Sequence, residues 1–418
     1  MSVAVVDEAK PQMPGGISVW RARWLLLRYG STMVVPPAGV EAPGQVDLLA
    51  LVAEVAERVG VVAPDVVLLT GTGTIRGWAR RSKRLLFVGL PLLLCLPVDE
   101  IRALVAHELA VLRYRRAHLV ARLRELHETA VEPLLHDAPL SRRSRAVLRV
   151  TSGFAADLER SADQAATSAS GLHTAARAVV KADLADFEFA DLVFDVEEQA
   201  WKHSRAGIRD IHDGWRAAIE AGAVIAELDE DTRAMLMRRH PYLANAIAPL
   251  RVEHVRLSEP TGRVPVHPVG AKAQRTLARQ ALNRDCRRWT TFAEVPAGVW
   301  PEWIVRQARE LTDQVGLLLG RDPLNAAEVV SVLATRLGEL VEANWPNQST
   351  DPEQLDGTPS MIVVAEAELT RRGWTRVHPA AAGVLAGPDG AVCNLHDLAR
   401  RAASDNAALT ELIDLLEP

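Results

Sequence analysis

The stretch that decides the fold lies at residues 85–109, which read LLFVGLPLLLCLPVDEIRALVAHEL. The segment from Arg84 to Gly89 is mostly apolar, which predicts a buried strand. Pro97 and Asp99 are typical helix-start residues. Beyond them, apolar side chains recur at the spacing of one helix face, at Ile101, Leu104, Val105, Leu109 and Leu112. We expect a strand, a turn and then a helix that continues to about Arg124.

Further elements extend from this stretch in both directions. Upstream, apolar residues recur at helical spacing from Trp20 to Gly60, most clearly from Val46 through Val59, and Gly60 should end the helix. The apolar run at residues 65–70 predicts a second buried strand, because glycines follow it directly. Downstream, two long helical patterns cover residues 141–184 and 196–237. The first part of the chain is therefore expected to be mainly helical.

The main domain boundary is predicted in the Pro- and Gly-rich segment at residues 258–270. We expect a flexible leader at 1–16, a first domain at 17–257, this linker, and a C-terminal α+β domain at 271–418. The predicted fold class is mainly α with a small β sheet. The elements expected after the linker are helices at 271–288, 301–319 and 326–344, a loop at 345–359, a strand at Met361–Ala365, a hairpin turn at Pro388-Asp389-Gly390, and a helix from Asp397.

Composition narrows the classes of partner and compartment. The chain has 418 residues, with 48 Lys and Arg against 53 Asp and Glu, for a formal charge of -5. This balance argues against a nucleic-acid partner, and an aromatic content of 5% is low for base stacking. Cys95, Cys286 and Cys393 have neither a disulfide framework nor metal-motif spacing. We therefore expect a reducing, cytoplasmic location.

No segment has the features of a membrane span or an export signal. The longest nearly uncharged apolar run, residues 85–98, is 14 residues long and contains two prolines. A spanning helix needs about 20 apolar residues. The N-terminal residues lack the basic region and apolar run that export requires. We expect a soluble chain without a transmembrane segment, and the sequence leaves its oligomeric state open.

The residues that could carry chemistry begin with His107-Glu108 on the predicted helix. In an H-E-x-x-H zinc peptidase, two histidines four residues apart bind one zinc, and the glutamate takes a proton from zinc-bound water. In this chain Val111 occupies the second ligand position. A His-Glu pair alone is weak evidence, because His127-Glu128 has the same form 20 residues later.

Three elements together resemble the HtpX-like, CAAX prenyl protease-type zinc metallopeptidases, a gluzincin family. The first is the strand, loop and helix of residues 85–109. The second, Glu159-Arg160-Ser161-Ala162-Asp163, resembles the family's E-x-x-A-D element on a second helix. The third, His240-Pro241-Tyr242-Leu243, is similar to a His-Pro element near the end of the peptidase domain. The three occur in the family's order, and the resemblance implies a gluzincin-like metallopeptidase domain at residues 17–257.

The resemblance also implies a zinc site and a role for each matching residue. His107 and Glu159 would be zinc ligands, and Glu108 would be the general base. Asp163 would orient His107 by contacting it from outside the coordination sphere. His240 would help to stabilise the oxyanion.

Two positions depart from the family's pattern. Val111 has no lone pair, so two protein ligands remain where a catalytic zinc has three and a water. Ala246 stands where the family has an arginine that would complement a tetrahedral intermediate. His118, on the same predicted helix as His107, would lie about 16 Å away along the axis, too far to share a metal. Other histidines could fold back as replacement ligands, namely His127, His136, His173, His203 and His212.

Each motif also has a plainer interpretation. Glu159 and Asp163 are four residues apart and could form a solvated helix face. His240-Pro241 could simply end a helix, because proline cannot continue one. The arginine-rich residues 113–149 could be a docking surface for an acidic partner or an anionic lipid. Acidic residues intervene in that region, so we favour the interpretation that it is the solvated side of two helices.

Three functional hypotheses follow. The first is a degenerate metallopeptidase, or pseudopeptidase, whose cleft serves as a binding or regulatory surface for a protein or peptide partner. The second is an active zinc endopeptidase that uses an unexpected third ligand and loses activity on Glu108→Gln. The third is a helical interaction scaffold with accidental motif matches and no cleft around Glu108. The first is favoured, because loss of the metal would remove both the nucleophile and the electrophile of the reaction.

Overall fold

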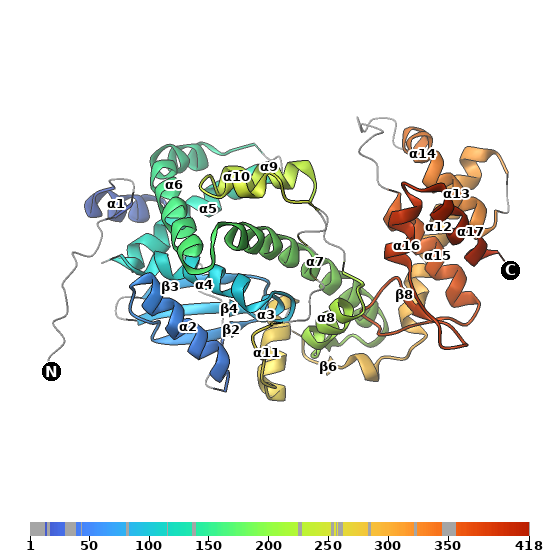
Figure 1. Ribbon diagram of the computed structural model, residues 1–418, viewed down its shortest axis with the longest axis horizontal. Coiled ribbons are helices and arrows are strands. Elements are labelled where there is room, and N and C mark those ends of the chain that lie inside the picture. The colour runs from blue at the N-terminus through green and yellow to red at the C-terminus, as the bar shows by residue number, and fades with distance from the viewer. Residues whose placement is uncertain are drawn as a thin grey trace. The chain divides into compact units, whose positions relative to one another are not determined.

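The computed structural model describes most of the chain, and the fold is mainly helical with small sheets, as predicted (Figure 1). The described residues are 13–14, 17–29, 39–42, 44–80, 83–114, 116–135, 139–224, 228–251, 255, 257, 262–282, 286–321, 324–344 and 357–417. Part of the predicted leader and most of the predicted 345–359 loop lie outside these residues.

The chain forms two compact units whose boundaries differ from the expected ones. The first unit consists of Met1–Ala190 and Ala226–Arg284, and the second of Asp191–Ile225 and Asp285–Pro418. The Pro- and Gly-rich segment does not separate them, because it is bonded to the first unit. Val98 N–H donates to the carbonyl of Gly262 (2.6 Å), and the Gln45 amide donates to the carbonyl of His267 (2.8 Å).

The first unit contains a four-stranded sheet in the order β1-β2-β4-β3. Its strands are β1 (Val40–Glu41), β2 (Val66–Thr70), β3 (Ile75–Arg80) and β4 (Lys83–Gly89). The two predicted strands, β2 and β4, pair in parallel, with Leu68 opposite Phe87. β3 was not predicted, because Gly77 and two arginines interrupt its apolar pattern. It pairs with β4 in antiparallel register, which places Gly77 opposite Leu86.

Helix α2 (Val46–Val59) covers the clearest part of the helical pattern predicted from Trp20 to Gly60, and it ends where expected. Gly60 adopts φ 71°, a left-handed conformation that glycine takes without steric cost, and its N–H caps the helix. The apolar run after β4 forms a six-residue helix, α3 (Leu90–Cys95), in which all six residues are buried. This run is therefore explained by burial in the first unit.

The predicted helix from Asp99 to Arg124 is wrong in its extent. α4 (Val98–Leu112) ends at Leu112, and a separate helix, α5 (Ala117–Leu135), starts at Ala117. The break lets apolar residues from both helices enter one buried cluster that includes Leu25, Val111, Tyr114, Leu119, Val120, Leu123 and Phe154. It also brings α5 back alongside β3 and α4. His118 is therefore not on the helix of His107.

The two long helices predicted in the middle region are each divided into shorter helices in the structure. The pattern over 141–184 divides at Gly171 (φ 86°) into α6 (Arg142–Ser170) and α7 (Leu172–Ser204). The pattern over 196–237 divides among the end of α7, α8 (Ile211–Glu220) and α9 (Glu230–Arg239). α9 ends directly before His240-Pro241, as predicted. The remaining helices of the first unit are α1 (Val19–Tyr29), α10 (Ala244–Ile247) and α11 (Ala271–Ala281).

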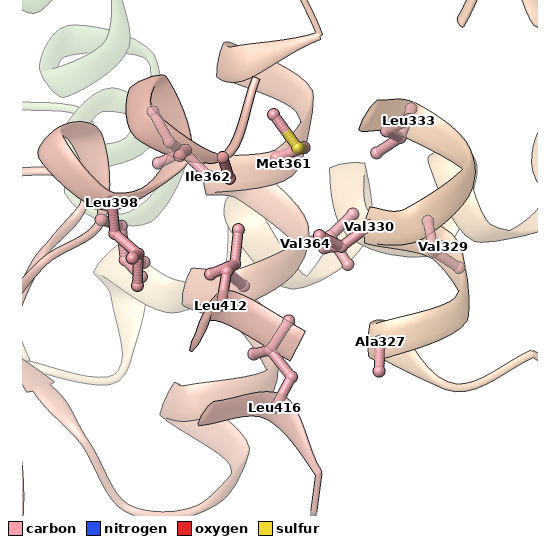
Figure 2. Packing of buried hydrophobic residues seen from close by; sticks show 14 of the residues in the cluster. Ala327, Val329, Val330, Leu333, Met361, Ile362, Val364, Leu398, Leu412 and Leu416 are labelled. Atoms are coloured by element: carbon pink, nitrogen blue, oxygen red, sulfur yellow. The ribbon is translucent and has the colours of Figure 1, made fainter. Parts of the chain in front are cut away.

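The second unit contains a helical core and two small sheets. The strands are β5 (Gly207–Ile208), which pairs with β6 (Trp289–Thr290), and β7 (Thr375–Arg376), β8 (Val384–Ala386) and β9 (Val392–Asn394). The helices after β6 are η3 (Phe292–Glu294), α12 (Val299–Leu319), α13 (Ala326–Thr335), α14 (Leu337–Asn344), α15 (Thr358–Arg371), α16 (Leu395–Ala402) and α17 (Asn406–Leu416). Figure 2 shows Val330, Met361, Leu398 and Leu412 pointing into one apolar cluster.

Several predictions for this unit can be compared with the structure. The hairpin at Pro388-Asp389-Gly390 is confirmed between β8 and β9. The predicted strand Met361–Ala365 is wrong, because these residues lie in α15. Met361, Ala365 and Leu369 are buried at four-residue spacing, so helix packing outweighs the β-branched composition of the run. The predicted helix 326–344 breaks at Arg336 into α13 and α14. The predicted helix 271–288 ends at Ala281.

Within the described part of the chain, no helix combines the length and the apolar character that crossing a membrane requires.

Candidate metal centre

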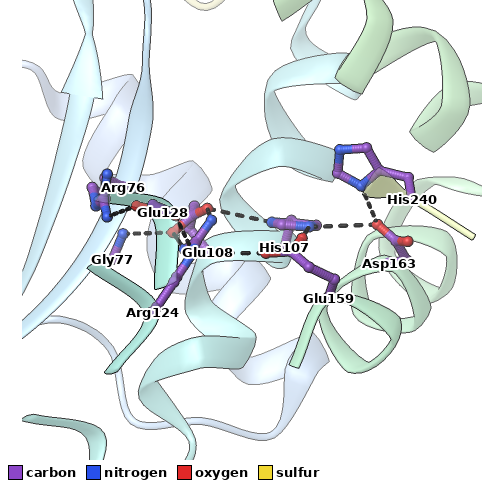
Figure 3. A network of polar contacts seen from close by, with 9 residues as sticks. All are labelled: Arg76, Gly77, His107, Glu108, Arg124, Glu128, Glu159, Asp163 and His240. Carbon is purple, nitrogen blue, oxygen red and sulfur yellow. Dashed lines mark hydrogen bonds and ion pairs between the residues drawn. The ribbon is translucent and has the colours of Figure 1, made fainter. Parts of the chain in front are cut away.

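Two packed helices and one helix end bring the motif residues together in the first unit (Figure 3). His107 and Glu108 lie on α4, and Glu159 and Asp163 lie one turn apart on α6. His240 follows the last residue of α9. Alanines line the contact between α4 and α6, namely Ala110, Ala162 and Ala165. These small side chains allow the two backbones to approach closely.

Four of these side chains form one compact group of possible metal ligands. Each of His107, Glu159, Asp163 and His240 offers a ligand atom, and the four atoms lie within 4.8 Å of one another. The Nε2 atom of His107 is 3.2 Å from Oε2 of Glu159 and 3.4 Å from Oδ1 of Asp163. The Nδ1 atom of His240 is 2.9 Å from Oδ1 of Asp163. This group could hold a metal ion.

The group also decides between the alternatives left open for its members. Asp163 is fully buried and the side chain of Glu159 is 16% exposed, so the solvated helix face is wrong for this pair. His240 is the C-cap of α9, as the plainer interpretation expected, and it is buried within the group as well. Asp163 contacts both His107 and His240. Its expected role in orienting His107 stays a prediction.

The histidines considered as replacement ligands lie elsewhere. Among the described residues, the group of four includes none of His118, His127, His173, His203 and His212. His127 lies with its Nδ1 atom 2.8 Å from Oγ1 of Thr151. His136 lies outside the described residues. The histidine that joins His107 is instead His240, which the resemblance had assigned to the oxyanion.

Three of the four side chains, His107, Glu159 and Asp163, have shifted pKa values. Burial disfavours a charged His107 ring, but hydrogen bonding to Asp163, Glu108 and Glu159 outweighs it and raises the pKa of His107 well above its ordinary value. Burial acts to raise the pKa of Glu159, yet Arg124 and His107 hold it well below the usual range. The pKa of Asp163 is lowered by hydrogen bonds from His107 and His240 against the effect of burial. A metal cation would therefore compete with a proton on His107.

The donor set fits a metal ion by an independent observation. Three buried atoms of the group, His107 Nε2, Glu159 Oε2 and Asp163 Oδ2, make no hydrogen bond of strict geometry, and the first two face each other as an ion pair at 3.2 Å. Buried polar atoms normally have partners, so such atoms require an explanation. Imidazole nitrogens and carboxylate oxygens are ligands for zinc and other first-row metals. With bonds of about 2.0–2.1 Å, tetrahedral zinc ligands are about 3.4 Å apart, close to the distances around His107.

Glu108, in contrast, is fully engaged by protein groups. Arg124 donates two hydrogen bonds to its carboxylate, from Nη1 to Oε2 (2.7 Å) and from Nη2 to Oε1 (2.9 Å). The N–H of Gly77 donates a third, to Oε2 (2.8 Å). The Nδ1 atom of His107 is 3.3 Å from Oε1. Burial raises the pKa of Glu108, but Arg124 and His107 outweigh it and hold the pKa well below the usual range.

Arg124 and Gly77 are site residues that the sequence did not identify. Arg124 belonged to the arginine-rich region assigned to solvated helix sides, yet it is 8% exposed. It also contacts Glu128, which in turn pairs with Arg76 on β3. One signal could have found Arg124, since it continues the apolar stripe of Val120 and Leu123 on α5. Other arginines of that region, including Arg142, Arg143, Arg145 and Arg149, are exposed.

The two departures from the family's pattern are both buried. Val111 is 1% exposed and belongs to the apolar cluster that joins α1, α4, α5 and α6. Ala246 is 3% exposed on the short helix α10. The side chains of Val111 and Ala246 are apolar, so neither can supply a ligand or a charge to the site.

Comparisons with known proteins add no relative. No protein-family model matches the chain, and no curated protein or solved structure matches it either. The resemblance to the HtpX-like peptidases therefore rests on the quoted motifs alone.

Proposed function

We propose that this protein is a metallopeptidase-like pseudopeptidase, in which the centre around His107 acts in binding or regulation instead of peptide hydrolysis. The observation that carries the proposal is the engagement of Glu108. Both nitrogens at the end of the Arg124 side chain and the N–H of Gly77 donate to its carboxylate. A general base needs a free lone pair within reach of the water that it deprotonates.

The electrostatics of Glu108 support the same conclusion. An efficient general base at neutral pH has a pKa near 7, which other enzymes reach by burying a glutamate without a positive partner. Arg124 has the opposite effect and holds the pKa of Glu108 well below its usual range. The carboxylate is therefore a very weak proton acceptor, and its interactions are those of a structural ion pair.

A metal ion at this centre would be held by His107, Glu159, Asp163 and His240. His240 would supply the ligand that Val111 cannot. Catalytic zinc sites have three protein ligands and an open position, whereas structural sites have four protein ligands and none open. Four protein ligands thus favour a structural or regulatory metal. A zinc held in this way would stabilise the packing of α4, α6 and the end of α9, because no position remains for a reactive water.

We expect a protein or peptide partner, because a metallopeptidase-like protein that does not hydrolyse peptides could still bind them. The compactness of the four-residue group around His107 supports a metallopeptidase-like origin over an accidental set of motif matches. The cytoplasmic location stays a prediction based on the wide spacing of the three cysteines in the sequence.

Metal analysis tests the centre directly. The protein, purified without chelators, should contain about one zinc or another first-row metal per chain, measured by inductively coupled plasma mass spectrometry. His107→Ala and His240→Ala should each lose most of it. His173→Ala is the matched control, because His173 is exposed on α7 and lies outside the group. Unchanged metal content in His240→Ala would refute His240 as the replacement ligand.

A cleavage assay separates the pseudopeptidase from the one alternative that His240 favours, an active endopeptidase. The native chain should leave an unstructured protein substrate intact over hours, with or without added zinc. Val111→His should also be inactive, because Glu108 stays engaged by Arg124. Cleavage by the native chain that disappears in Glu108→Gln would overturn the proposal and establish the endopeptidase.

A further inference from the structure

Helix α1 (Val19–Tyr29) has one face that is packed into the first unit. Ala22, Leu25 and Leu26 are 0%, 0% and 8% exposed. They belong to the apolar cluster formed with residues of α4, α5 and α6. In Figure 1, α1 lies next to α5 and α6, and α1 contacts both helices. The buried face fixes the helix to the unit and decides which side chains it presents outward.

The opposite face of α1 presents two tryptophans. Trp20 is 74% exposed and Trp24 is 39% exposed. They lie four residues apart and therefore on one side of the helix. At 100° per residue, this side points away from Ala22, Leu25 and Leu26. Such exposure of the largest apolar side chains is unusual and marks an interaction surface.

Arginines flank the tryptophans on this face. Arg21, Arg23 and Arg28 are exposed, and the helix contains no acidic residue. The guanidinium of Arg28 lies 5.1 Å from the ring centroid of Trp24, as in a cation–π contact. The chain as a whole has a formal charge of -5, so the positive charge is a local property of this helix.

We propose that the exposed face of α1 docks the protein on an anionic lipid surface. Indole rings favour the boundary between headgroups and acyl chains, and arginines on the same face attract lipid phosphates and carboxylates. No acidic residue of α1 offsets the positive charge of this face. At 11 residues, α1 is about 16 Å long, which suits a helix that lies along a surface.

A second group of exposed arginines lies on the neighbouring helix α6. α6, which contacts α1, begins with exposed arginines at Arg142, Arg143, Arg145 and Arg149. The sequence had left two interpretations for this region, a docking surface and a solvated helix side. The position of α1 favours the docking surface for anionic lipid, because it adds apolar groups that can enter the headgroup layer.

Vesicle sedimentation tests the proposal with the full chain. Vesicles of phosphatidylcholine mixed with phosphatidylserine should sediment the protein at low salt, and vesicles of phosphatidylcholine alone should not. The triple change Arg21→Gln, Arg23→Gln and Arg28→Gln should lower the partition coefficient about a hundredfold, at about fivefold per arginine. Trp20→Ser with Trp24→Ser should lower it by at least tenfold. Leu317→Ser, at a residue that is 79% exposed on α12, is the matched control and should change nothing.

Three outcomes would overturn this inference. These are equal sedimentation with both kinds of vesicle, no sedimentation with either kind, and binding that the tryptophan and arginine variants leave unchanged. A dimer that dissociates on Trp20→Ser in analytical ultracentrifugation would make the face a protein interface and would equally refute it. The substituted side chains are exposed, so circular dichroism and the Tm of each variant should match those of the native chain.

Discussion

Two buried glutamates, one in each unit, are held by the same kinds of partner, an arginine and a glycine N–H. Glu108 accepts hydrogen bonds from Arg124 and from the N–H of Gly77 at 2.8 Å. Glu366, on α15, accepts them from Arg376 and from the N–H of Gly383 at 2.7 Å. The two glutamates are 5% and 1% exposed. Each unit therefore uses an arginine and a glycine N–H to satisfy one buried carboxylate.

The difference lies in what surrounds each pair. Arg376 also donates to the carbonyl of Pro379 (2.9 Å), so the Glu366 pair fastens the segment between β7 and β8. Among the described residues, the group that could hold a metal lies beside Glu108 and does not include any residue near Glu366. At Glu366 the arrangement satisfies a buried carboxylate and joins α15 to the segment after β7. The same arrangement at Glu108 therefore requires no catalytic explanation.

The largest expected effect comes from removing either arginine. Arg124→Met and Arg376→Met each keep a long side chain but leave a buried carboxylate without its charge partner. Each should lower the free energy of unfolding of its own unit by about 3–5 kcal/mol, measured by urea denaturation. Arg401→Met is the control. Its partner is Glu411 and both side chains are more than half exposed, so the loss should be about 0–1 kcal/mol.

The result for Arg124→Met tests whether Glu108 depends on its arginine partner. If Arg124→Met were as mild as Arg401→Met, Glu108 would not depend on its partner, and its structural role would be refuted. Combining Glu108→Leu with Arg124→Met should restore part of the stability, because no buried charge then remains unpaired.

The glycines should give the next largest effect. A Cβ atom at Gly77 would lie 2.6 Å from the backbone oxygen of Glu108. A Cβ atom at Gly383 would lie 2.5 Å from Nε2 of His396, and the φ of Gly383 is +73°. Alanine at either position should therefore cost about 1–3 kcal/mol of stability. Gly298→Ala, where the added atom meets nothing within 4 Å, should be neutral or slightly stabilising in the same denaturation experiment.

A smaller, pH-dependent effect is expected in the second unit. Burial lowers the pKa of His396, against the opposing effect of its hydrogen bond with the carbonyl of Ala382. The folded state then binds fewer protons than the unfolded state below the ordinary histidine pKa of about 6.5. Stability contributed by neutral His396 is present above that pH and is lost as the pH falls toward the folded pKa.

Thermal unfolding between pH 7.5 and 5 tests this sign. The Tm of the second unit should fall with pH, and His396→Gln should reduce the slope. The pKa of His378 is also lowered by burial, so His396→Gln should not abolish the slope. A Tm that rises as the pH falls, to an extent that depends on His396, would contradict the expectation.

The smallest effect concerns the thiols of the two units. Burial raises the pKa of Cys95 in the first unit to about 12. Cys393 in the second unit is only partly buried, although its pKa is raised by burial as well. Iodoacetamide should therefore modify Cys393 first in the native protein, and Cys95 only after unfolding, as read by peptide mass spectrometry. Early modification of Cys95 would show that α3 opens in the native state.

The elements that the sequence predicted correctly have strong local signals. Gly60 ends α2, the apolar runs form β2 and β4, and Pro388-Asp389-Gly390 forms a hairpin turn. The failures occur where tertiary contacts decide. β3 contains Gly77 because the backbone of α4 passes close to it, and this approach leaves no local pattern. The break after Leu112 likewise serves a cluster whose members are distant in sequence.

For the site, too, the sequence predicted the residues with local motifs but not the contacts that depend on the tertiary fold. The sequence named His107, Glu159, Asp163 and His240, and the structure brings their ligand atoms together. It assigned His240 to the oxyanion and did not name it as a possible metal ligand, because its distance from the other ligand atoms depends on where α9 ends in space. Arg124 was also beyond prediction as a partner of Glu108, since the expected continuous helix would have carried it far along the axis.

The division of the chain has a consequence for synthesis on the ribosome. Residues 191–225 belong to the second unit but emerge before residues 226–284, which complete the first. The early segment must therefore wait for residues 285–418 before its own unit can form. Helix α11 is also synthesised after this segment, and it must then pack against β1 and β2. In the folded unit, Gln280 on α11 accepts a hydrogen bond from the N–H of Gly71 (2.7 Å). A chain that ended at residue 257 would lack α11, and the parts of β1 and β2 that α11 contacts would then be exposed.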